Sequence, residues 1–281
     1  MATLPFVKMH GIGNDYVYVD AFAHRVADPA ALARRVSPRR TGIGSDGLIL
    51  ICPSDVADAR MEMYNADGSR GAMCGNGIRC VGKYVADHGL SANQSLRIET
   101  DSGIKTLSLT RKGGQVVEVT VDMGAPILDG PRIPVAAEGR VIDAPLEVAG
   151  ARHRVTCVSM GNPHCVVFRD DVDELDLERL GPPFEHHPFF PDRVNTEFIR
   201  VDSPSLLRMR VWERGSGETA ACGTGACAAL VAAVLTGRAE RRATLRLNGG
   251  DLAIEWRAGD DHVLMTGGAE EVFHGTIEVD G

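Results

Sequence analysis

The chain has 281 residues, of which 44% are hydrophobic and 24% charged, and its formal net charge at pH 7 is -8. This composition is typical of a folded globular protein, and the length accommodates two domains of ordinary size. A net negative charge argues against nucleic acid as the main partner, because phosphate neutralisation needs clustered Lys and Arg. The one basic cluster is interpreted as the solvated end of a helix; it contains Arg34, Arg35, Arg39 and Arg40.

In chain order, the first half begins with a Gly13-Asn14 turn that leads into a strand. An alternating strand later runs into a Gly-rich loop and a Cys-Gly-x-Gly turn at 74–77, and a helix is expected to follow and to end at Gly89, which suits the position after a helix C-cap. Period-two alternation and β-branched residues predict the strands. The expected ranges are 16–20, 61–64, 95–100, 105–110 and 116–124 for strands and 79–89 for the helix.

The second half repeats this order. A Gly161-Asn162 turn precedes a strand, and a second Cys-Gly-x-Gly turn at 222–225 precedes a helix that closes at Gly237. The Pro-rich stretch 181–192, which contains His186 and His187, is expected to be a loop. The expected ranges are 165–168, 207–212, 244–248, 252–256 and 262–268 for strands and 226–237 for the helix.

The two halves are related by one constant shift. Subtracting 74 from 222 gives 148 positions, and the same shift places RMEMYN at 60–65 on RMRVWE at 208–213. We therefore expect two homologous, pseudo-symmetric domains of the α+β class, each a mainly antiparallel or mixed sheet wrapped around a central helix. The expected boundaries are 1–122 plus 266–281 for the N-terminal domain, with Cys74, and 123–265 for the C-terminal domain, with Cys222.

The two cysteines are candidates for acid–base chemistry. A helix N-terminus offers unpaired N–H groups and partial positive charge, so two such turns are expected to face each other across a cleft, one as thiolate and one as thiol. One would remove a proton from a carbon and the other would deliver one to its opposite face. The helix dipole lowers a thiol pKa by at most about 1.5 units, so further partners are needed, and His164 and Glu213 are the candidates.

Simpler interpretations apply to the remaining features. Five cysteines are expected to be small buried hydrophobic residues: Cys52, Cys80, Cys157, Cys165 and Cys227. The Gly-rich loops could be mere turns, and His164 could be an ordinary surface histidine. No ligand spacing indicates a metal site, and neither Gly-rich turn matches a dinucleotide or phosphate-binding fingerprint.

Location follows from what the sequence lacks. The most apolar stretch, 219–237, is rich in Gly and Ala and falls short of a membrane span, and 1–11 lacks the pattern of a signal peptide. Seven cysteines, an odd number without a CxxC pair, favour reduced thiols over a disulfide framework. We therefore expect a cytoplasmic protein with no membrane partner.

At these motifs the chain resembles the diaminopimelate epimerase family. The resemblance runs nearly end to end through KMHGIGNDYVYVD, GIGSDGL, YNADGSRGAMCGNGIRC, GNPHCVVF, VNTEF and VWERGSGETAACGTGA, the last being the most specific. It implies interconversion of LL- and meso-2,6-diaminoheptanedioate at one α-carbon, in lysine and peptidoglycan precursor biosynthesis, with no pyridoxal phosphate or other cofactor. It also implies two domains that close over a small-molecule substrate, and a possible homodimer.

The resemblance assigns roles by position. Cys74 resembles the cysteine that takes the proton from the LL isomer, and Cys222 the one that serves the meso isomer, while His164 and Glu213 sit where the family tunes them. The implied loops that hold the reacting carboxylate are Gly75-Asn76 and Gly223-Thr224, and the implied polar shell is Asn14, Asn65, Asn162, Asn195, Glu213 and Arg214. Gly47 is a possible further position, where some members have Gln, so that a side-chain contact is absent or replaced in this chain.

Three other functions stay open from the residues alone. A proline, hydroxyproline or other amino-acid racemase of the same fold would also use paired cysteines. A cysteine hydrolase would use Cys74 or Cys222 as nucleophile with His164 as base, and gives no reason for the second cysteine. A redox or binding protein would join Cys74 and Cys222 in a disulfide.

Overall fold

The computed structural model describes residues 2–279. The chain divides into two compact units: unit 1 is Met1–Val121 with Gly267–Gly281, and unit 2 is Asp122–Thr266. Each junction lies one residue from the expected boundary. The end of the chain thus belongs to the first unit.

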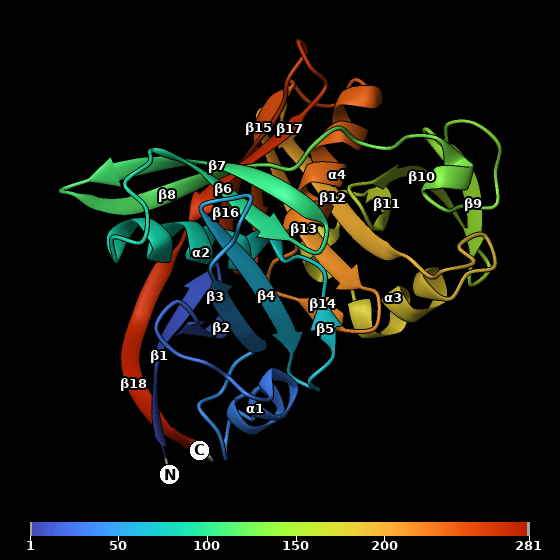
Figure 1. Cartoon of the computed structure of the whole chain (residues 1–281). Coiled ribbons are helices and arrows are strands. Elements are labelled where there is room, and N and C mark those ends of the chain that lie inside the picture. Colours follow the sequence, from blue (N-terminus) through green and yellow to red (C-terminus); the bar gives the residue numbers. More distant parts are fainter. Residues whose placement is uncertain (1, 280–281) are drawn as a thin grey trace. The chain divides into compact units, whose positions relative to one another are not determined.

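In unit 1, eight strands pair in the order β8-β7-β6-β4-β3-β2-β1-β18 (Figure 1). The pairs β2–β3 and β4–β6 are parallel and the others antiparallel, and the short β5 pairs with β4. The elements are β1 (Ala2–Gly11), β2 (Asn14–Asp20), α1 (Pro29–Val36), β3 (Gly47–Cys52), β4 (Ala59–Asn65), β5 (Arg70–Gly71), α2 (Gly75–Asp87), β6 (Ser95–Thr100), β7 (Gly103–Lys112), β8 (Gln115–Asp122) and β18 (Glu270–Val279).

Unit 2 has the same order of pairing, β17-β16-β15-β13-β12-β11-β10-β9. The parallel pairs, β11–β12 and β13–β15, occupy the equivalent places, and β14 pairs with β13 as β5 does with β4. The elements are the 3-10 turns Gly130–Arg132 and Val172–Glu174, β9 (Ala144–Val148), β10 (Ala151–Ser159), β11 (Pro163–Phe168), α3 (Leu177–Glu185), β12 (Asn195–Ser203), β13 (Leu206–Glu213), β14 (Gly217–Thr219), α4 (Gly223–Leu235), β15 (Arg242–Leu247), β16 (Gly250–Trp256) and β17 (Val263–Gly268).

The two sheets therefore match strand for strand, with one difference in connectivity. The strand beside β10 is β9, which immediately precedes it in the chain, whereas the strand beside β1 is β18, from the end of the chain. The predicted α+β fold with two pseudo-symmetric halves is confirmed.

The central helices are α2 and α4, each lying among the strands of its own unit (Figure 1). Every residue from 75 to 86 of α2 is buried, and α4 is buried along most of its length. A helix buried on all sides has to be surrounded by other elements, here by the sheet of its unit. Both helices end before a glycine with positive φ, Gly89 (+72°) and Gly237 (+69°), as predicted. Within residues 2–279 no helix has the length and apolarity that spanning a bilayer requires.

Both central helices begin earlier than the sequence pattern predicts, at Gly75 and Gly223 and not at 79 and 226. The physical reason is that Cys74 and Cys222 are themselves the N-cap residues, with extended backbone angles. The glycines of each turn therefore form the first helical turn. Each cysteine consequently lies directly at a helix N-terminus.

The Pro-rich stretch expected to be a loop is partly helical, because α3 extends through Pro182 and Pro183 to Glu185. Tertiary packing outweighs the proline preference here. A Cβ on Gly181 would lie 2.1 Å from the Trp212 ring, so this glycine lets the helix pack directly on the indole. His186 is the C-cap residue, and His187 follows the helix.

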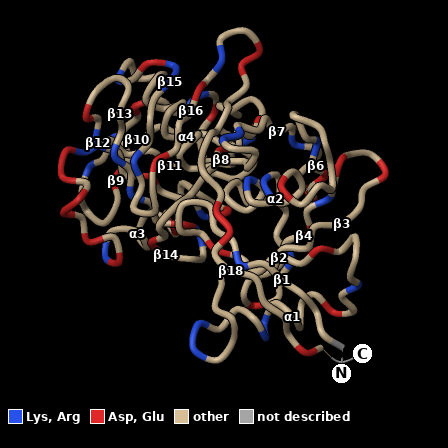
Figure 2. Tube along the Cα trace, turned by 90° about the vertical axis from the view of Figure 1, so that its left-hand side faces the viewer, with Lys and Arg blue, Asp and Glu red and all other residues tan. Residues whose placement is uncertain are grey.

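The basic cluster is only partly the solvated helix end that was expected. Arg34 and Arg35 lie in the last turn of α1, but Arg39 contacts two carboxylates, Asp15 at 2.7 Å and Asp46 at 2.8 Å. Figure 2 shows Lys and Arg positions interspersed with Asp and Glu along the chain. The arginine cluster is thus partly neutralised by neighbours within its own unit.

Candidate functional site

In unit 1 the candidate residues meet at the start of α2. The half-buried Cys74 thiol accepts a hydrogen bond from the Gly77 N–H at 3.3 Å and donates one to Asn14 Oδ1 at 3.1 Å. Asn14 begins β2, while Gly75 and Asn76 form the buried first turn of the helix. The fold therefore brings residues 60 positions apart in sequence to one thiol.

The Asn14 amide is held by a carboxylate that sequence reasoning missed. Asn14 Nδ2 donates to Asp46 Oδ2 at 2.7 Å, the Asp15 N–H donates to the same oxygen at 3.1 Å, and Arg39 contacts the other oxygen. This orients the amide oxygen of Asn14 toward the thiol. Asp46 lies within the GIGSDGL motif but was not among the predicted site residues, and no local pattern relates it to Asn14.

Beneath this arrangement, Asp15 forms an ion pair with the buried Lys8 at 2.5 Å. Burial raises the pKa of Asp15, but hydrogen bonds and charges from Arg39 and Lys8 outweigh it and lower the pKa below its usual range. A carboxyl whose pKa is lowered by folding stabilises the fold above its unfolded pKa, about 3.9, and that stabilisation is lost as the pH falls through the folded pKa.

Asp15→Asn is accordingly expected to reduce the free energy of unfolding by about 1.5–3 kcal/mol at neutral pH, because it leaves the buried Lys8 without its charged partner. The difference from the unsubstituted chain should shrink below about pH 4, where the Asp15 carboxyl of the unfolded chain takes up a proton before that of the folded chain does. Urea unfolding at pH 7 and pH 3 measures both quantities. A difference that stays constant between these pH values would contradict the ion pair.

Gly47 begins β3 and lies opposite Asn65, the last residue of β4. A Cβ at Gly47 would lie 2.1 Å from the Tyr64 carbonyl oxygen and 3.0 Å from the Tyr16 ring. In this chain the tyrosine ring and the neighbouring strand thus fill the space that a longer side chain would need. Asn65 itself donates to Ser69 Oγ at 2.9 Å, within the loop that follows.

Gly47→Ala is therefore expected to destabilise the protein by about 1–3 kcal/mol, the cost of forcing atoms into a filled core. The melting temperature should fall, while Gly259→Ala, at a glycine whose Cβ would meet nothing within 4 Å, should leave it nearly unchanged. Equal melting temperatures for the two variants would show that β3 moves aside freely.

In unit 2 the second thiol, Cys222, is buried at the start of α4, 3.6 Å from Thr224 Oγ1. Burial and the carboxylates of Glu213 and Glu197 raise the pKa of Cys222 well above its usual range, against smaller opposing contributions from Thr224 and the Gly225 N–H. The group in this environment is a protonated thiol. The helix start alone does not bring it near neutrality.

Glu213, the last residue of β13, accepts a hydrogen bond from Thr219 Oγ1 on β14. Burial raises the pKa of Glu213, while hydrogen bonds from Thr219 and Cys222 and the charge of His164 oppose this. The carboxylate and the thiol therefore share one environment, and each affects the proton affinity of the other. Thr219 was not identified from the sequence, although it lies in the GSGET motif.

His164 is fully buried, so the interpretation as a surface histidine is wrong. Its Nδ1 lies 2.7 Å from Glu197 Oε1 and its Nε2 lies 3.0 Å from Asn162 Oδ1. Glu197, on β12, was not predicted, although the VNTEF motif contains it.

Two further candidates contact each other across a loop. Asn195 Oδ1 accepts from the Arg214 N–H at 3.0 Å, and Asn195 Nδ2 donates to the Pro163 carbonyl at 2.8 Å. The Arg214 guanidinium, partly exposed, donates to the Asp192 carbonyl at 2.9 Å. Arg214 therefore retains N–H groups that can bind a carboxylate.

The other cysteines lie away from helix starts. Cys80, Cys157, Cys165 and Cys227 are buried and Cys52 is half-buried. Burial raises the pKa of Cys52 and of Cys80 to about 11. Cys222 also has a raised pKa, so position at a helix start, and not thiol acidity, distinguishes Cys74 and Cys222 from these five residues.

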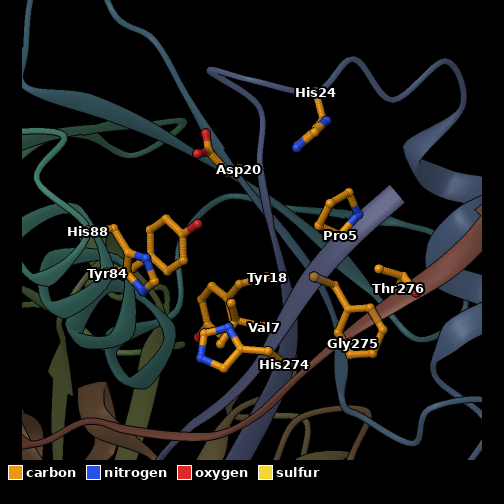
Figure 3. A pocket seen from close by; sticks show the side chains of 11 residues that line it. Pro5, Val7, Tyr18, Asp20, His24, Tyr84, His88, His274, Gly275 and Thr276 are labelled. Atoms are coloured by element: carbon orange, nitrogen blue, oxygen red, sulfur yellow. The ribbon is translucent and has the colours of Figure 1, made fainter. Parts of the chain in front are cut away.

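A hollow of about 500 Å³ lies on unit 1, beside β1 and β18 (Figure 3). Tyr84 and His88 stack there, with ring centroids 3.9 Å apart, and His274 also lines the hollow. Among the described residues that line it, none belongs to the candidate set. The hollow is therefore a feature separate from the Cys74 turn.

Comparison with known proteins identifies the chain. A solved hydroxyproline epimerase from Agrobacterium vitis, with bound trans-4-OH-L-proline, is 18% identical and matches 99% of this chain and 93% of its own with a TM-score of 0.69. The chain thus has the fold of that epimerase. The family model for diaminopimelate epimerase matches residues 6–128 and 156–272. The chain belongs to the diaminopimelate epimerase family.

Individual relatives are similar in sequence to this chain along nearly their whole length. The diaminopimelate epimerase of Acetivibrio thermocellus is 54% identical over 275 residues, 98% of each chain. That of Moorella thermoacetica is 56% identical over 277 residues, 98% of this chain and 99% of its own. The predicted family resemblance is confirmed.

Proposed function

We propose that the protein is an isomerase that interconverts LL- and meso-2,6-diaminoheptanedioate by proton transfer at one α-carbon, without a cofactor, in lysine and peptidoglycan precursor biosynthesis. The observation that carries this proposal is the identity of 54–56% with diaminopimelate epimerases over nearly the full length of both chains. The duplicated cysteine turns support it, because each places a thiol at a helix start.

In the proposed reaction, Cys74 as thiolate removes the α-proton of the LL isomer and Cys222 as thiol delivers a proton to the opposite face. The protonated state favoured for Cys222 by burial and by Glu213 suits this delivering role. In the reverse reaction the roles exchange, and Glu213, with its raised pKa, is the group beside Cys222 that accepts the thiol proton.

Substrate binding follows from the same elements. The N–H groups at Gly75-Asn76 and Gly223-Thr224, at two helix N-termini, bind the reacting carboxylate and stabilise the negative charge that develops on it. Arg214 binds the distal carboxylate, and Asn14, Asn65, Asn162 and Asn195 bind polar groups of the substrate. Arg214 has Ala66 as its counterpart at the 148-residue shift, so only one end of the substrate meets a guanidinium.

The reduced thiols that this reaction requires are consistent with a cytoplasmic enzyme. We also propose a homodimer, as the family resemblance implies. Sedimentation of the reduced protein at micromolar concentration measures the oligomeric state, and a monomer under these conditions contradicts the dimer.

The experiment that tests the function uses the reduced protein in deuterium oxide with LL-diaminopimelate and no added cofactor. We expect deuterium at one α-carbon and formation of the meso isomer, followed by NMR and chiral chromatography. Proline and trans-4-hydroxyproline are the comparison substrates. Exchange into these and not into diaminopimelate would assign the racemase alternative, and a trapped thioester would assign a hydrolase.

A further inference from the structure

One buried carboxylate near Cys222 neither binds the substrate nor exchanges a proton in the reaction proposed above. Glu197 and His164 are both completely buried, and Glu197 Oε1 lies 2.7 Å from His164 Nδ1. Burying an ionisable side chain is unfavourable unless it is paired and hydrogen-bonded. Filling the core is therefore not a sufficient explanation for a carboxylate in this position.

The carboxylate of Glu197 lies against the first turn of α4. A Cβ on Gly225 would lie 2.5 Å from Glu197 Oε1 and 3.2 Å from the Cys222 sulfur. The absence of a side chain at Gly225 lets the carboxylate approach the helix N-terminus, where negative charge is stabilised. The carboxylate, the imidazole and the thiol are thus packed around one helix start.

The opposite edge of the imidazole faces a candidate substrate-binding residue. His164 Nε2 lies 3.0 Å from Asn162 Oδ1. An ionised carboxylate can accept hydrogen bonds but cannot donate them, so in the bond to an ionised Glu197 the donor is Nδ1–H of His164. This bond fixes the ring plane and thereby the direction in which Nε2 meets Asn162.

The first unit shows which side chain occupies the place equivalent to that of Glu197 when no charge is present. At the 148-residue shift, Gly225 corresponds to Gly77, Glu197 to Ile49 and His164 to Tyr16. A Cβ on Gly77 would lie 2.7 Å from Ile49 Cδ1, so a hydrocarbon side chain occupies the place beneath the helix. An isoleucine side chain therefore fills this position in unit 1, so packing alone does not explain why unit 2 has a carboxylate there.

We propose that Glu197 is a positioning residue of the Cys222 half-site. It orients His164 through Nδ1, and His164 in turn orients Asn162 for the substrate. The inference rests on the proposed function for its effect on turnover, whereas the hydrogen bond itself can be tested without a substrate.

The test replaces Glu197 with Gln, which keeps the shape and removes the charge. In full-length protein with 15N-labelled histidine, the Nδ1 resonance of His164, assigned by its loss in His164→Gln, is expected to shift relative to the unsubstituted chain. With diaminopimelate, kcat is expected to fall about 10- to 100-fold, the range for a hydrogen bond to a charged group, with a smaller change in KM.

Phe198→Leu is the matched control. Its ring lies in the unit 2 core on the same strand and packs edge-on against Phe184, so the variant loses packing next to Glu197 and keeps the carboxylate. We expect Phe198→Leu to lower the melting temperature. Its kcat should stay within twofold of the unsubstituted protein, and the His164 resonance should not shift.

An unchanged His164 resonance together with an unchanged kcat in Glu197→Gln would overturn the proposal and leave Glu197 a core residue. If Glu197→Gln does not fold, Glu197→Asp withdraws the carboxylate by one methylene and is judged by the same two measurements. If the unsubstituted protein fails to epimerise diaminopimelate, the proposed function fails, and the resonance still decides whether Glu197 orients the ring.

Discussion

Replacing either Cys74 or Cys222 with Ala is expected to reduce epimerisation of diaminopimelate by about 10²- to 10⁴-fold, the usual contribution of a positioned acid or base. Both variants should lose turnover in both directions, because the reaction needs one group to remove the proton and a different group to replace it. The measurement is kcat for the LL and meso isomers by chiral chromatography, under reducing conditions.

The matched control is Cys52→Ala, which removes a half-buried thiol that does not lie at a helix start. It should retain kcat within about twofold, as expected for a substitution away from the reacting groups. Circular dichroism shows whether all three variants fold. Substantial turnover in either Cys74→Ala or Cys222→Ala would rule out the two-base reaction, and the reducing conditions separate true loss from oxidation of the thiols.

Much of the fold was predictable because the sequence contains two related halves with the same order of elements. The strands from β6 to β8 and from β15 to β17 alternate at period two, and the glycines after α2 and α4 mark the helix ends, so local pattern and structure agree. The shift of 148 also made the fold class predictable, because a strand or helix that was uncertain in one half could be compared with its counterpart in the other half.

What escaped prediction depends on tertiary contacts. In the Pro-rich helix α3, Gly181 packs on Trp212, which is distant in sequence. The role of β18 as the outer partner of β1 joins the two ends of the chain. Neither relation has a local signature, because propensity and periodicity describe only near neighbours.

The residues of the candidate site also divide into those that a local motif predicts and those that depend on tertiary contacts. Motif position was sufficient to nominate the cysteines and their helix starts, and these residues do lie at helix N-termini. Asp46 and Glu197 were missed because their partners are 32 and 33 residues away in sequence, and are brought close where β2 lies beside β3 and β11 beside β12. The raised pKa of Cys222 was also not predictable, since it depends first on burial.

The Glu213→Gln variant is expected to make Cys222 more reactive and the enzyme less active. The negative charge of Glu213 is one cause of the raised pKa of Cys222, so the amide should lower that pKa. At any pH below the thiol pKa, the thiolate fraction then increases, up to about tenfold for each pKa unit lost. Alkylation of Cys222 by iodoacetamide, measured on its peptide by mass spectrometry, should accelerate.

Epimerisation should nevertheless fall by about 10²-fold, because glutamine cannot accept the thiol proton that the proposed reaction assigns to Glu213. Glu218→Gln, in the same hairpin but paired with Arg210 at 2.8 Å, is the control and should change neither quantity appreciably. Faster alkylation with unchanged kcat would show that Glu213 affects the thiol without exchanging protons with it. Slower alkylation would contradict the electrostatic argument, because removing a neighbouring negative charge favours the thiolate and so cannot by itself slow its reaction.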